Sequence, residues 1–290
     1  MNKVDIAHYK DRPCIRITSP NMSAKFLYED GGKLASLSFN GVETLAQRQG
    51  AHYLRLFADT SYVKSECSGF DDMFPTIDPC VIGDFSYPDH GQVCRMPFNV
   101  ELADDSFALS CYADSVNAVF SKTVSAESDS LIIEYSIENK NDFPLPYIWA
   151  GHVMLAGEQG AYIETPFSKT TPYTVCFGAP PDNKCTLQGY GENKEYKFYY
   201  DKPQAPLFCS VVYPSRKRKI SFYFEGGSVK YLGLWFNPGD LNRMYNLAVE
   251  PCTAPYDTPT NAEKAGMGSF IEPLSTVRFS LRIDCSEVSI

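Results

Sequence analysis

Alternation of apolar and polar residues recurs from one end of this 290-residue chain to the other. It is clearest in six segments, which are residues 15–18, 35–39, 107–111, 133–138, 220–225 and 277–283. A period of two places apolar side chains on one face of a β-strand and polar side chains on the other. The pattern therefore predicts strands along the whole chain, each with one buried face.

Turn signals separate these segments, and few windows suit a helix. Gly31-Gly32, Asn40-Gly41 and Gly226-Gly227 are typical of turns, and 20 prolines spread through the chain disfavour long helices. Short helices are expected at residues 44–49 and 261–265. With no internal repeat or linker, the sequence predicts an all-β fold, in which residues 1–290 form a single large antiparallel β-sandwich domain.

The charge and hydropathy of the chain exclude several kinds of partner. The net charge is -9, so the surface repels phosphate backbones and nucleic acid is not expected to bind. The basic run at residues 216–219 is interpreted as a solvated turn before a strand, with a phosphate clamp as the alternative. No apolar stretch approaches the ~18 residues of a membrane span, and the N-terminal segment lacks the apolar core of a secretory signal. We therefore expect a cytoplasmic protein without a membrane partner.

The 10 cysteines form no C-x-x-C pair and no cluster with histidine. This spacing argues against a zinc site, so no metal is expected. In the cytoplasm the thiols should be reduced, and most are expected to be small core residues.

Three residues stand out as candidates for proton transfer. His90 precedes Gly91 and His152 follows Gly151, and the glycines allow sharp turns or close backbone approach beside each imidazole. Glu250 ends an apolar run, where an unpaired charge is costly unless the carboxylate has a role or accepts hydrogen bonds. Histidine and carboxylate side chains suit acid–base chemistry near neutral pH. For each residue, a structural role in hydrogen bonding is the alternative.

A loop-like segment at residues 68–76 places paired carboxylates, Asp71 and Asp72, beside Phe70 and Phe74. Aromatic faces with adjacent acceptors suit sugars, which offer apolar C–H faces and hydroxyl donors. An exposed acidic turn, a glycosidase pair and a metal site are the alternatives.

These segments, taken in order, resemble the aldose 1-epimerases, also called galactose mutarotases, and within them a bacterial group of uncharacterised sugar specificity. The resemblance covers nearly the whole chain. It is carried by a glycine-led strand entry, the loop GFDDMFPTIDPC, an Asp-His-Gly motif, a Gly-His pair and the segment AVEPCTAP, at residues 31–37, 69–80, 89–91, 151–152 and 248–255.

The resemblance implies a β-supersandwich and a cofactor-free reaction that interconverts the α and β anomers of a free sugar. It implies that Glu250 takes the proton from the anomeric hydroxyl and that His152 gives a proton to the ring oxygen. His90 would hold the ring or hydroxyl oxygens and polarise the opening step. These roles suit the residue types, since a carboxylate can accept a proton and a protonated imidazole can donate one.

The chain departs from the family's pattern where the family reads sugar hydroxyls. The family's Asn-Arg pair and its mid-chain aspartate motif are absent, and Val153 stands where a proline follows the second histidine. The candidates for sugar recognition are Asp71, Asp72, Trp235, Asn237 and, in place of the missing arginine, Arg55.

Three other functions stay open at this point. A sandwich of this kind could bind carbohydrate without catalysis, act on a hexose 6-phosphate, or serve as a glycoside hydrolase or polysaccharide lyase. The sequence does not indicate which sugar is used or how many copies of the chain assemble.

Overall fold

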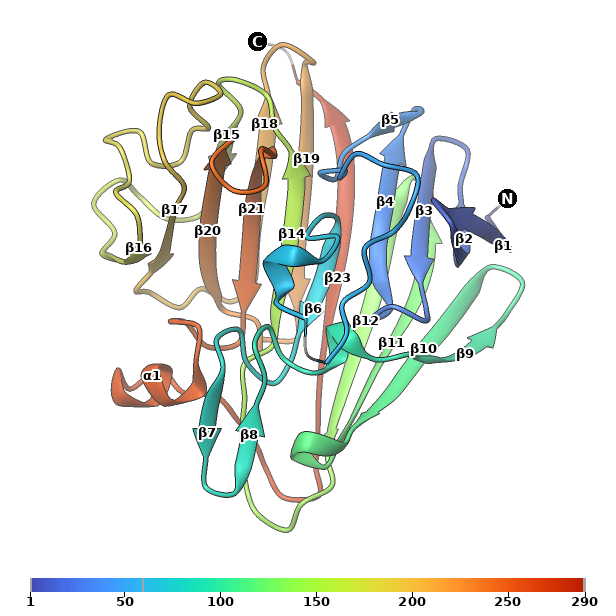
Figure 1. Cartoon of the computed structure of the whole chain (residues 1–290), viewed down its shortest axis with the longest axis vertical. Coiled ribbons are helices and arrows are strands. Elements are labelled where there is room, and N and C mark those ends of the chain that lie inside the picture. The colour runs from blue at the N-terminus through green and yellow to red at the C-terminus, as the bar shows by residue number, and fades with distance from the viewer. Residues whose placement is uncertain (1, 59, 289–290) are drawn as a thin grey trace.

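The computed structural model describes residues 2–58 and 60–288 and consists of two antiparallel β-sheets that lie one over the other (Figure 1). The larger sheet has eleven strands, in the order β1 (Lys3–Tyr9), β2 (Arg12–Thr18), β3 (Met22–Leu27), β4 (Lys33–Phe39), β6 (Phe70–Met73), β14 (Ala150–Ala156), β21 (Tyr245–Cys252), β20 (Tyr231–Pro238), β17 (Tyr196–Tyr200) and β16 (Tyr173–Phe177), with β5 (Val42–Glu43) beside β4.

The second sheet has eight strands, in the order β15 (Tyr162–Glu164), β18 (Leu207–Tyr213), β19 (Arg218–Glu225), β23 (Thr276–Glu287), β12 (Ser130–Asn139), β11 (Ala118–Glu127), β10 (Ser106–Ala113) and β9 (Asn99–Leu102). Two small sheets pair β7 (Cys80–Ile82) with β8 (Phe85–Tyr87) and β13 (Leu145–Pro146) with β22 (Phe270–Ile271). The helical elements are α1 (Pro259–Lys264) and three 3-10 turns at Tyr62–Lys64, Val93–Arg95 and Asp114–Val116.

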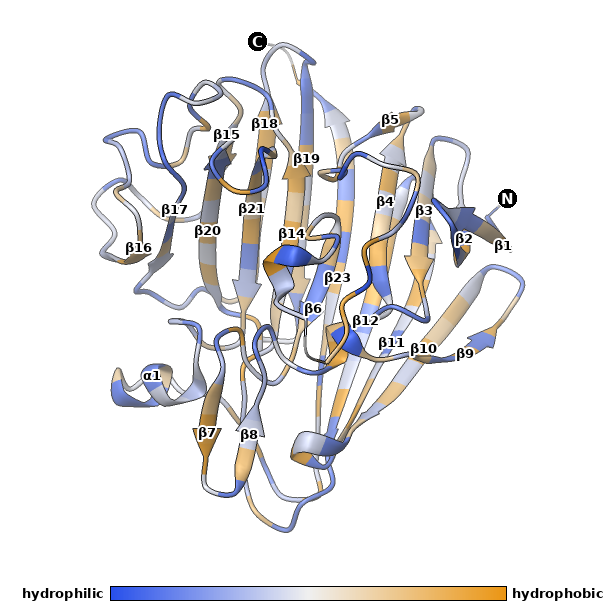
Figure 2. Ribbon diagram, in the orientation of Figure 1, coloured by the Kyte–Doolittle hydropathy of each residue, from blue (hydrophilic) through white to orange (hydrophobic). Residues whose placement is uncertain are grey.

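The main core lies between the two sheets and confirms the all-β sandwich expected from the alternating pattern. Phe107, Leu109, Ile133, Ile137 and Phe222 are almost fully buried there. Figure 2 shows the corresponding bands of apolar and polar residues along the strands. Burial of these faces supplies the driving force that holds the sheets together, at roughly 25 cal/mol per Å² of apolar surface.

The two sheets differ in how much of their surface is covered. On the second sheet the outward side chains are partly or fully exposed, as along β12 and β23. In the larger sheet the middle strands are buried on both faces, and every residue of β20 is buried. A second apolar cluster covers the outer face of these strands and includes Tyr199, Tyr231 and Trp235. The larger sheet therefore has a second, partly apolar side on which a site can be built.

One expected helix is present and the other is wrong. α1 covers most of the expected 261–265 segment, and its N-cap Thr258 accepts a hydrogen bond from the backbone of Asn261. Residues 44–49 contain no helix, because residues 44–46 run beside β14, where the backbone of Thr44 and Ala46 bonds to Ala156 and Met154. In the part of the chain that the structure describes, no helix is long and apolar enough to cross a membrane.

The alternation expected at residues 35–39 breaks at Ala35. β3 and β4 shift register there, so that Lys25 pairs with Ser36 and Phe26 pairs with Leu34. Leu34 and Leu37 both face the main core, whereas Ala35 packs in a separate cluster. An extra residue of this kind bends and twists a strand locally.

Candidate active site

Three charged or polar side chains converge on the covered outer face of the larger sheet. His152 lies on β14, Glu250 on β21 and Lys197 on β17. On each strand a residue next to the polar one points into the main core, namely Val153 on β14, Val249 on β21 and Phe198 on β17. The pleat therefore turns all three polar groups to the same side of the sheet.

These groups line a cavity of about 310 Å³ together with His90 and Trp235. The Nε2 atom of His152 lies 3.6 Å from the Oε1 atom of Glu250. The rings of His90 and His152 have centroids 6.0 Å apart and are nearly perpendicular. The cavity thus brings together the two histidines and the glutamate that the sequence singled out, and its size is at the small end of ligand sites.

His90 reaches the cavity from the loop that follows β8. It adopts a left-handed conformation, with φ of 57°, and its Nδ1 lies 2.7 Å from the Oδ1 of Asp89. The ring of Tyr62 stacks on the imidazole at a centroid distance of 4.0 Å. The hydroxyl of Tyr62 donates to Asp71, which also accepts a hydrogen bond from Lys33. Asp71 and Tyr62 therefore hold one face of His90 in place.

Gly91 sets the position of the His90 loop. Its φ is 73°, and a Cβ built on it would lie 2.4 Å from the carbonyl oxygen of Phe74. Gly91→Ala is therefore expected to lower the free energy of unfolding by about 1–3 kcal/mol, because the loop must move or remain strained. Urea unfolding would measure this loss. Gly83→Ala is a matched control, since Gly83 also has a positive φ but a Cβ there meets open space. Equal losses in the two variants would show that the close approach to Phe74 does not matter.

Lys197 joins two carboxylates at the base of the cavity. Its Nζ lies 2.6 Å from the Oε2 of Glu250 and 2.7 Å from the Oδ1 of Asp257. The hydroxyl of Tyr199 also donates to Asp257. Asp257 follows β21 in a left-handed conformation, as does Tyr256 before it, so two uncommon backbone conformations aim this carboxylate at Lys197.

Burial and charge act in opposite directions on these groups. Burial raises the pKa of Glu250 above the usual glutamate value, and the Lys197 ammonium opposes that rise. Burial would lower the pKa of Lys197, but the carboxylates of Asp257 and Glu250 outweigh it and raise that pKa. Lys197 is therefore a fixed positive charge that favours the ionised form of Glu250.

His152 is in an environment that disfavours its charged form. Burial, followed by the charges of His90 and Lys197, lowers the pKa of His152 well below its ordinary value. The carboxyl of Asp89 is in an environment that favours its charged form. The hydrogen bond from His90 holds the pKa of that carboxyl below its usual range. Each imidazole thus has a carboxylate beside it, Asp89 next to His90 and Glu250 next to His152.

Three polar atoms of the site are buried without a hydrogen-bond partner among the described residues. They are the Nδ1 of His152 and both carboxylate oxygens of Glu250, of which Oε2 has the Lys197 ion pair and Oε1 does not. Leaving a buried polar atom unpaired costs about 1–3 kcal/mol, so such atoms call for an explanation. A ligand in the cavity would provide a hydrogen bond to Glu250.

The paired aspartates of β6 point to opposite sides of the larger sheet. Asp71 faces the outer side, where it supports Tyr62. Asp72 faces the main core, where its carboxylate accepts from Lys122 and from the indole nitrogen of Trp149. Neither residue lines the cavity. Asp71 is linked to the cavity by its hydrogen bond with Tyr62, which is a lining residue. Asp72 lies in the interior of the sandwich.

Of the other three candidates for sugar recognition, one lines the cavity and two do not. Trp235 lines the cavity, with its ring centroid 6.0 Å from that of His152. Asn237 holds the following turn by bonding to both backbone groups of Leu241, and Leu241 lines the cavity. Arg55 lies outside the cavity, where its guanidinium pairs with Asp30.

The sequence reasoning missed Lys197, Asp257 and Tyr62. The sequence does mark Lys197, because it is the one charged residue in the aromatic run at residues 196–200 and stands between Tyr196 and Phe198. Asp257 lies two residues after the glutamate segment, but the left-handed backbone that directs it to Lys197 has no signal in the sequence. Tyr62 lies in an irregular segment with no periodicity, so no local pattern marks it.

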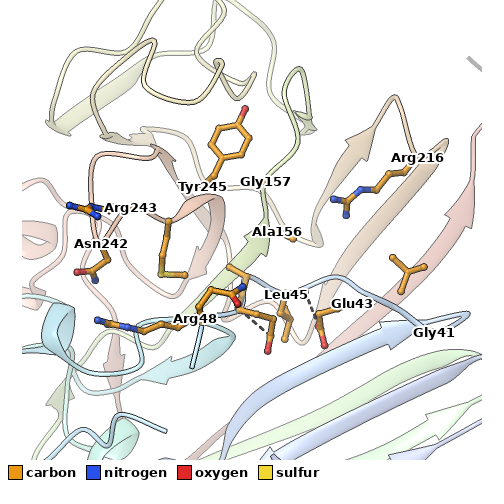
Figure 3. Close-up of a pocket in the computed structure, with 15 residues that line it drawn as sticks. Gly41, Glu43, Leu45, Arg48, Ala156, Gly157, Arg216, Asn242, Arg243 and Tyr245 are labelled. Atoms are coloured by element: carbon orange, nitrogen blue, oxygen red, sulfur yellow. Dashed lines mark hydrogen bonds between the residues drawn. The ribbon is translucent and has the colours of Figure 1, made fainter. Parts of the chain in front are cut away.

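A larger groove of about 930 Å³ lies near the other end of the outer face, but it lacks the groups for acid–base chemistry (Figure 3). The figure shows Arg48 and Arg243 on one side of it and Arg216 on the other. Glu43 is the one carboxylate among its described lining residues. That carboxylate accepts hydrogen bonds from the backbone N–H groups of Leu37, Thr44 and Leu45. These bonds give it a structural role. We therefore place the candidate site in the smaller cavity.

Among residues 2–58 and 60–288, no group of three or more histidine, cysteine, aspartate or glutamate side chains is placed to hold a metal ion.

The fold is similar to that of several solved structures of low sequence identity. A Klebsiella pneumoniae protein proposed to be an aldose 1-epimerase has a TM-score of 0.77 at 16% identity, over 99% of this chain and 83% of that one. A galactose mutarotase-like protein from Clostridium acetobutylicum has a TM-score of 0.68 at 14% identity, over 99% of both chains. A Synechocystis protein has a TM-score of 0.71 at 17% identity, over 98% of this chain and 99% of that one.

Comparisons with protein-family models and with curated protein sequences find no match. At identities this low, the structural likeness shows a mutarotase-like β-sandwich and not an activity. The function has to be argued from the site.

Proposed function

We propose that this chain is an aldose 1-epimerase, which interconverts the α and β anomers of a free sugar by opening and closing its ring. The observation that carries the proposal is the convergence of Glu250 and His152 in one cavity, with Nε2 and Oε1 3.6 Å apart and Oε1 otherwise unpartnered. A buried carboxylate beside two imidazoles can exchange protons with a bound sugar hydroxyl and ring oxygen.

Glu250 is the proposed base. Its Oε1 takes the proton of the anomeric hydroxyl, and the electron pair of that O–H bond forms the second bond of the C1–O1 carbonyl. The bond between C1 and the ring oxygen breaks, and its electron pair leaves with the ring oxygen, which receives a proton. Rotation about C1–C2 followed by reclosure gives the other anomer. The Lys197 ammonium, 2.6 Å from Oε2, keeps the base ionised before this step.

The two imidazoles are proposed to act as a unit that protonates the ring oxygen as it leaves. Two like charges so close together and so buried disfavour each other, so the pair is expected to hold one proton. Asp89 balances that proton on the His90 side, and His152 adjoins Glu250. Sequence resemblance assigns the proton to His152 alone, and the low pKa of His152 is the reason to involve both.

The charge of the cavity argues against a hexose 6-phosphate as substrate. Lys197 is the one lysine or arginine among its described lining residues, and Asp257 and Glu250 already pair with it. A phosphate group would have no free cation to bind. We propose an unphosphorylated sugar, and we place the reaction in the cytoplasm, where the ten cysteines, all free in the structure, would stay reduced.

The direct test follows the approach to anomeric equilibrium after pure α-aldoses are dissolved with and without the protein. Polarimetry or NMR at neutral pH should show faster equilibration for at least one sugar. A protein that binds a sugar but leaves its rate at the value for buffer would be a carbohydrate-binding sandwich without catalysis. Hydrolysis of glycosides without faster anomerisation would instead favour a glycosidase.

A further inference from the structure

The candidate cavity carries more negative charge than acid–base chemistry on a neutral sugar requires. Four carboxylates line it, from Asp78, Glu195, Glu250 and Asp257, against the single ammonium of Lys197. With the one proton that the two histidines are proposed to share, the four carboxylates and Lys197 leave the lining with a net charge of -2. A concave site lined by one sign of charge focuses its field and raises the local concentration of ligands of the opposite sign.

Two of these carboxylates have no cation to balance them. Glu250 and Asp257 share Lys197. Glu195 and Asp78 form no ion pair with any residue in the described part of the chain, although Glu195 is half-buried. Burial raises the pKa of Glu195, which reflects the cost of holding its charge there. A bound cation would relieve that cost.

Glu195 lines the same cavity as the acid–base groups and is close to Lys197 in the sequence. Glu195 immediately precedes β17 and lies two residues before Lys197, and both residues line the cavity. Their Cα atoms are separated by roughly 7 Å, which is one full repeat of a strand. Because Lys197 contacts Glu250, one sugar ring placed with its anomeric carbon at Glu250 can direct another substituent toward Glu195.

A further feature indicates that the charged cavity is built to receive a ligand. Glu250 lines the cavity, and its Oε1 is buried and has no hydrogen-bond partner among the described residues. No described group of three or more histidine, cysteine, aspartate or glutamate side chains is placed to hold a metal ion. An ammonium group on an organic ligand needs only one carboxylate partner, and Glu195 offers one.

We propose that the preferred substrate of this cavity is a sugar that carries an ammonium group, with Glu195 as its main partner and Asp78 as a second negative charge at the rim. This inference rests on the proposed function, since it assumes that the cavity binds a sugar. The ammonium group donates hydrogen bonds to the carboxylate of Glu195 while Glu250 meets the anomeric hydroxyl. A phosphate or carboxylate on the sugar would be repelled.

The test compares the affinity for 2-, 3- and 6-amino-deoxyglucose and the matching galactose amines with that for glucose and galactose. Isothermal titration at about pH 6.5 keeps the amines protonated, since amines of this kind titrate nearer 8. At least one amine should bind about tenfold more tightly than its hydroxyl parent, the effect of one charge-assisted hydrogen bond. The gain should shrink as salt is added. N-acetylation, which removes the charge, should abolish it.

The variant Glu195→Gln should remove most of the tenfold ratio between the amine and its parent sugar. Glu101→Gln is the matched control, since it makes the same change of charge on an exposed carboxylate of β9 in the other sheet, and it should preserve the ratio. Equal affinity for amines and parents, or no binding of any amine, would overturn the proposal. A preference unchanged in Glu195→Gln would overturn the role of Glu195.

The same sugars separate this inference from the proposed function. Faster anomerisation of glucose or galactose without any preference for the amines would keep the epimerase and reject the ammonium selectivity. Tight, salt-sensitive binding of an amine with no change in the anomerisation rate of any sugar would reject the epimerase activity instead.

Discussion

Glu250→Gln is expected to lower kcat/KM for anomerisation by about 10³-fold, because a positioned general base contributes roughly 10²–10⁴-fold. Glutamine has the size of glutamate but cannot accept the proton of the anomeric hydroxyl. The fold should persist, since Lys197 keeps Asp257 as a partner at 2.7 Å. Polarimetry with the best substrate of the wild-type protein measures the rate, and circular dichroism measures the folded fraction.

Glu66→Gln is the matched control for this substitution. Glu66 is also a buried glutamate paired with a lysine, Lys10, but it does not line the cavity. After correction for folded fraction, its variant should anomerise sugars at nearly the wild-type rate. If Glu250→Gln were as active as wild type, Glu250 could not be the base, and the proposed mechanism would be wrong.

Lys197→Met is expected to lower the free energy of unfolding at neutral pH by about 3–5 kcal/mol, the typical cost of removing one partner from a buried ion pair. The substitution keeps the length and apolar character of the side chain. It leaves Glu250 and Asp257 as two buried carboxylates without a cation between them. Urea unfolding at pH near 7 would measure the loss.

The effect should depend on pH in a defined direction. In the wild-type protein Lys197 opposes the rise in the pKa of Glu250 and helps to lower that of Asp257, so both pKa values should rise in the variant. An acid whose pKa is higher in the folded state destabilises the fold above its unfolded pKa. That penalty fades once the pH falls below the unfolded values of about 4. The difference between variant and wild type should therefore shrink between neutral pH and about pH 4.

Lys202→Met is the control for the loss of a lysine, because Lys202 is exposed and forms no ion pair in the described part of the chain. Its unfolding free energy should match that of wild type within about 0.5 kcal/mol at both pH values. A Lys197→Met variant equally destabilised at both pH values would mean that lost packing, and not unpaired charge, is responsible.

The alternating pattern predicts the fold best where one face of a strand meets solvent. Ile133, Tyr135 and Ile137 of β12 show the period because their neighbours on the second sheet are exposed or partly exposed. β20 and β14 show little alternation, since they are buried on both faces. The helix expected at residues 44–49 failed because pairing with β14 outweighs a local helical preference, which a single sequence does not reveal.

The site was predictable in its chemistry and less so in its geometry. His90, His152 and Glu250 combine unusual residue types with marked local settings, and the structure brings them into one cavity. Their roles as catalytic groups stay predictions. Asp71 and Asp72 are adjacent, and their opposite directions follow from which residues of β6 the sheet turns outward. That direction depends on strand pairing between distant segments, so the two could not be told apart beforehand.

The unequal covering of the two sheets determines where this protein can be engineered. A labelling site, a purification handle or a change of surface charge belongs on the outward positions of β10 and β23, where side chains such as Tyr112 and Arg282 point to water. A similar change on β20 would disturb either the main core or the site, because every side chain of that strand is buried on one face of the sheet or the other. Libraries meant to alter substrate choice should therefore vary the loops around the cavity and keep the central strands unchanged.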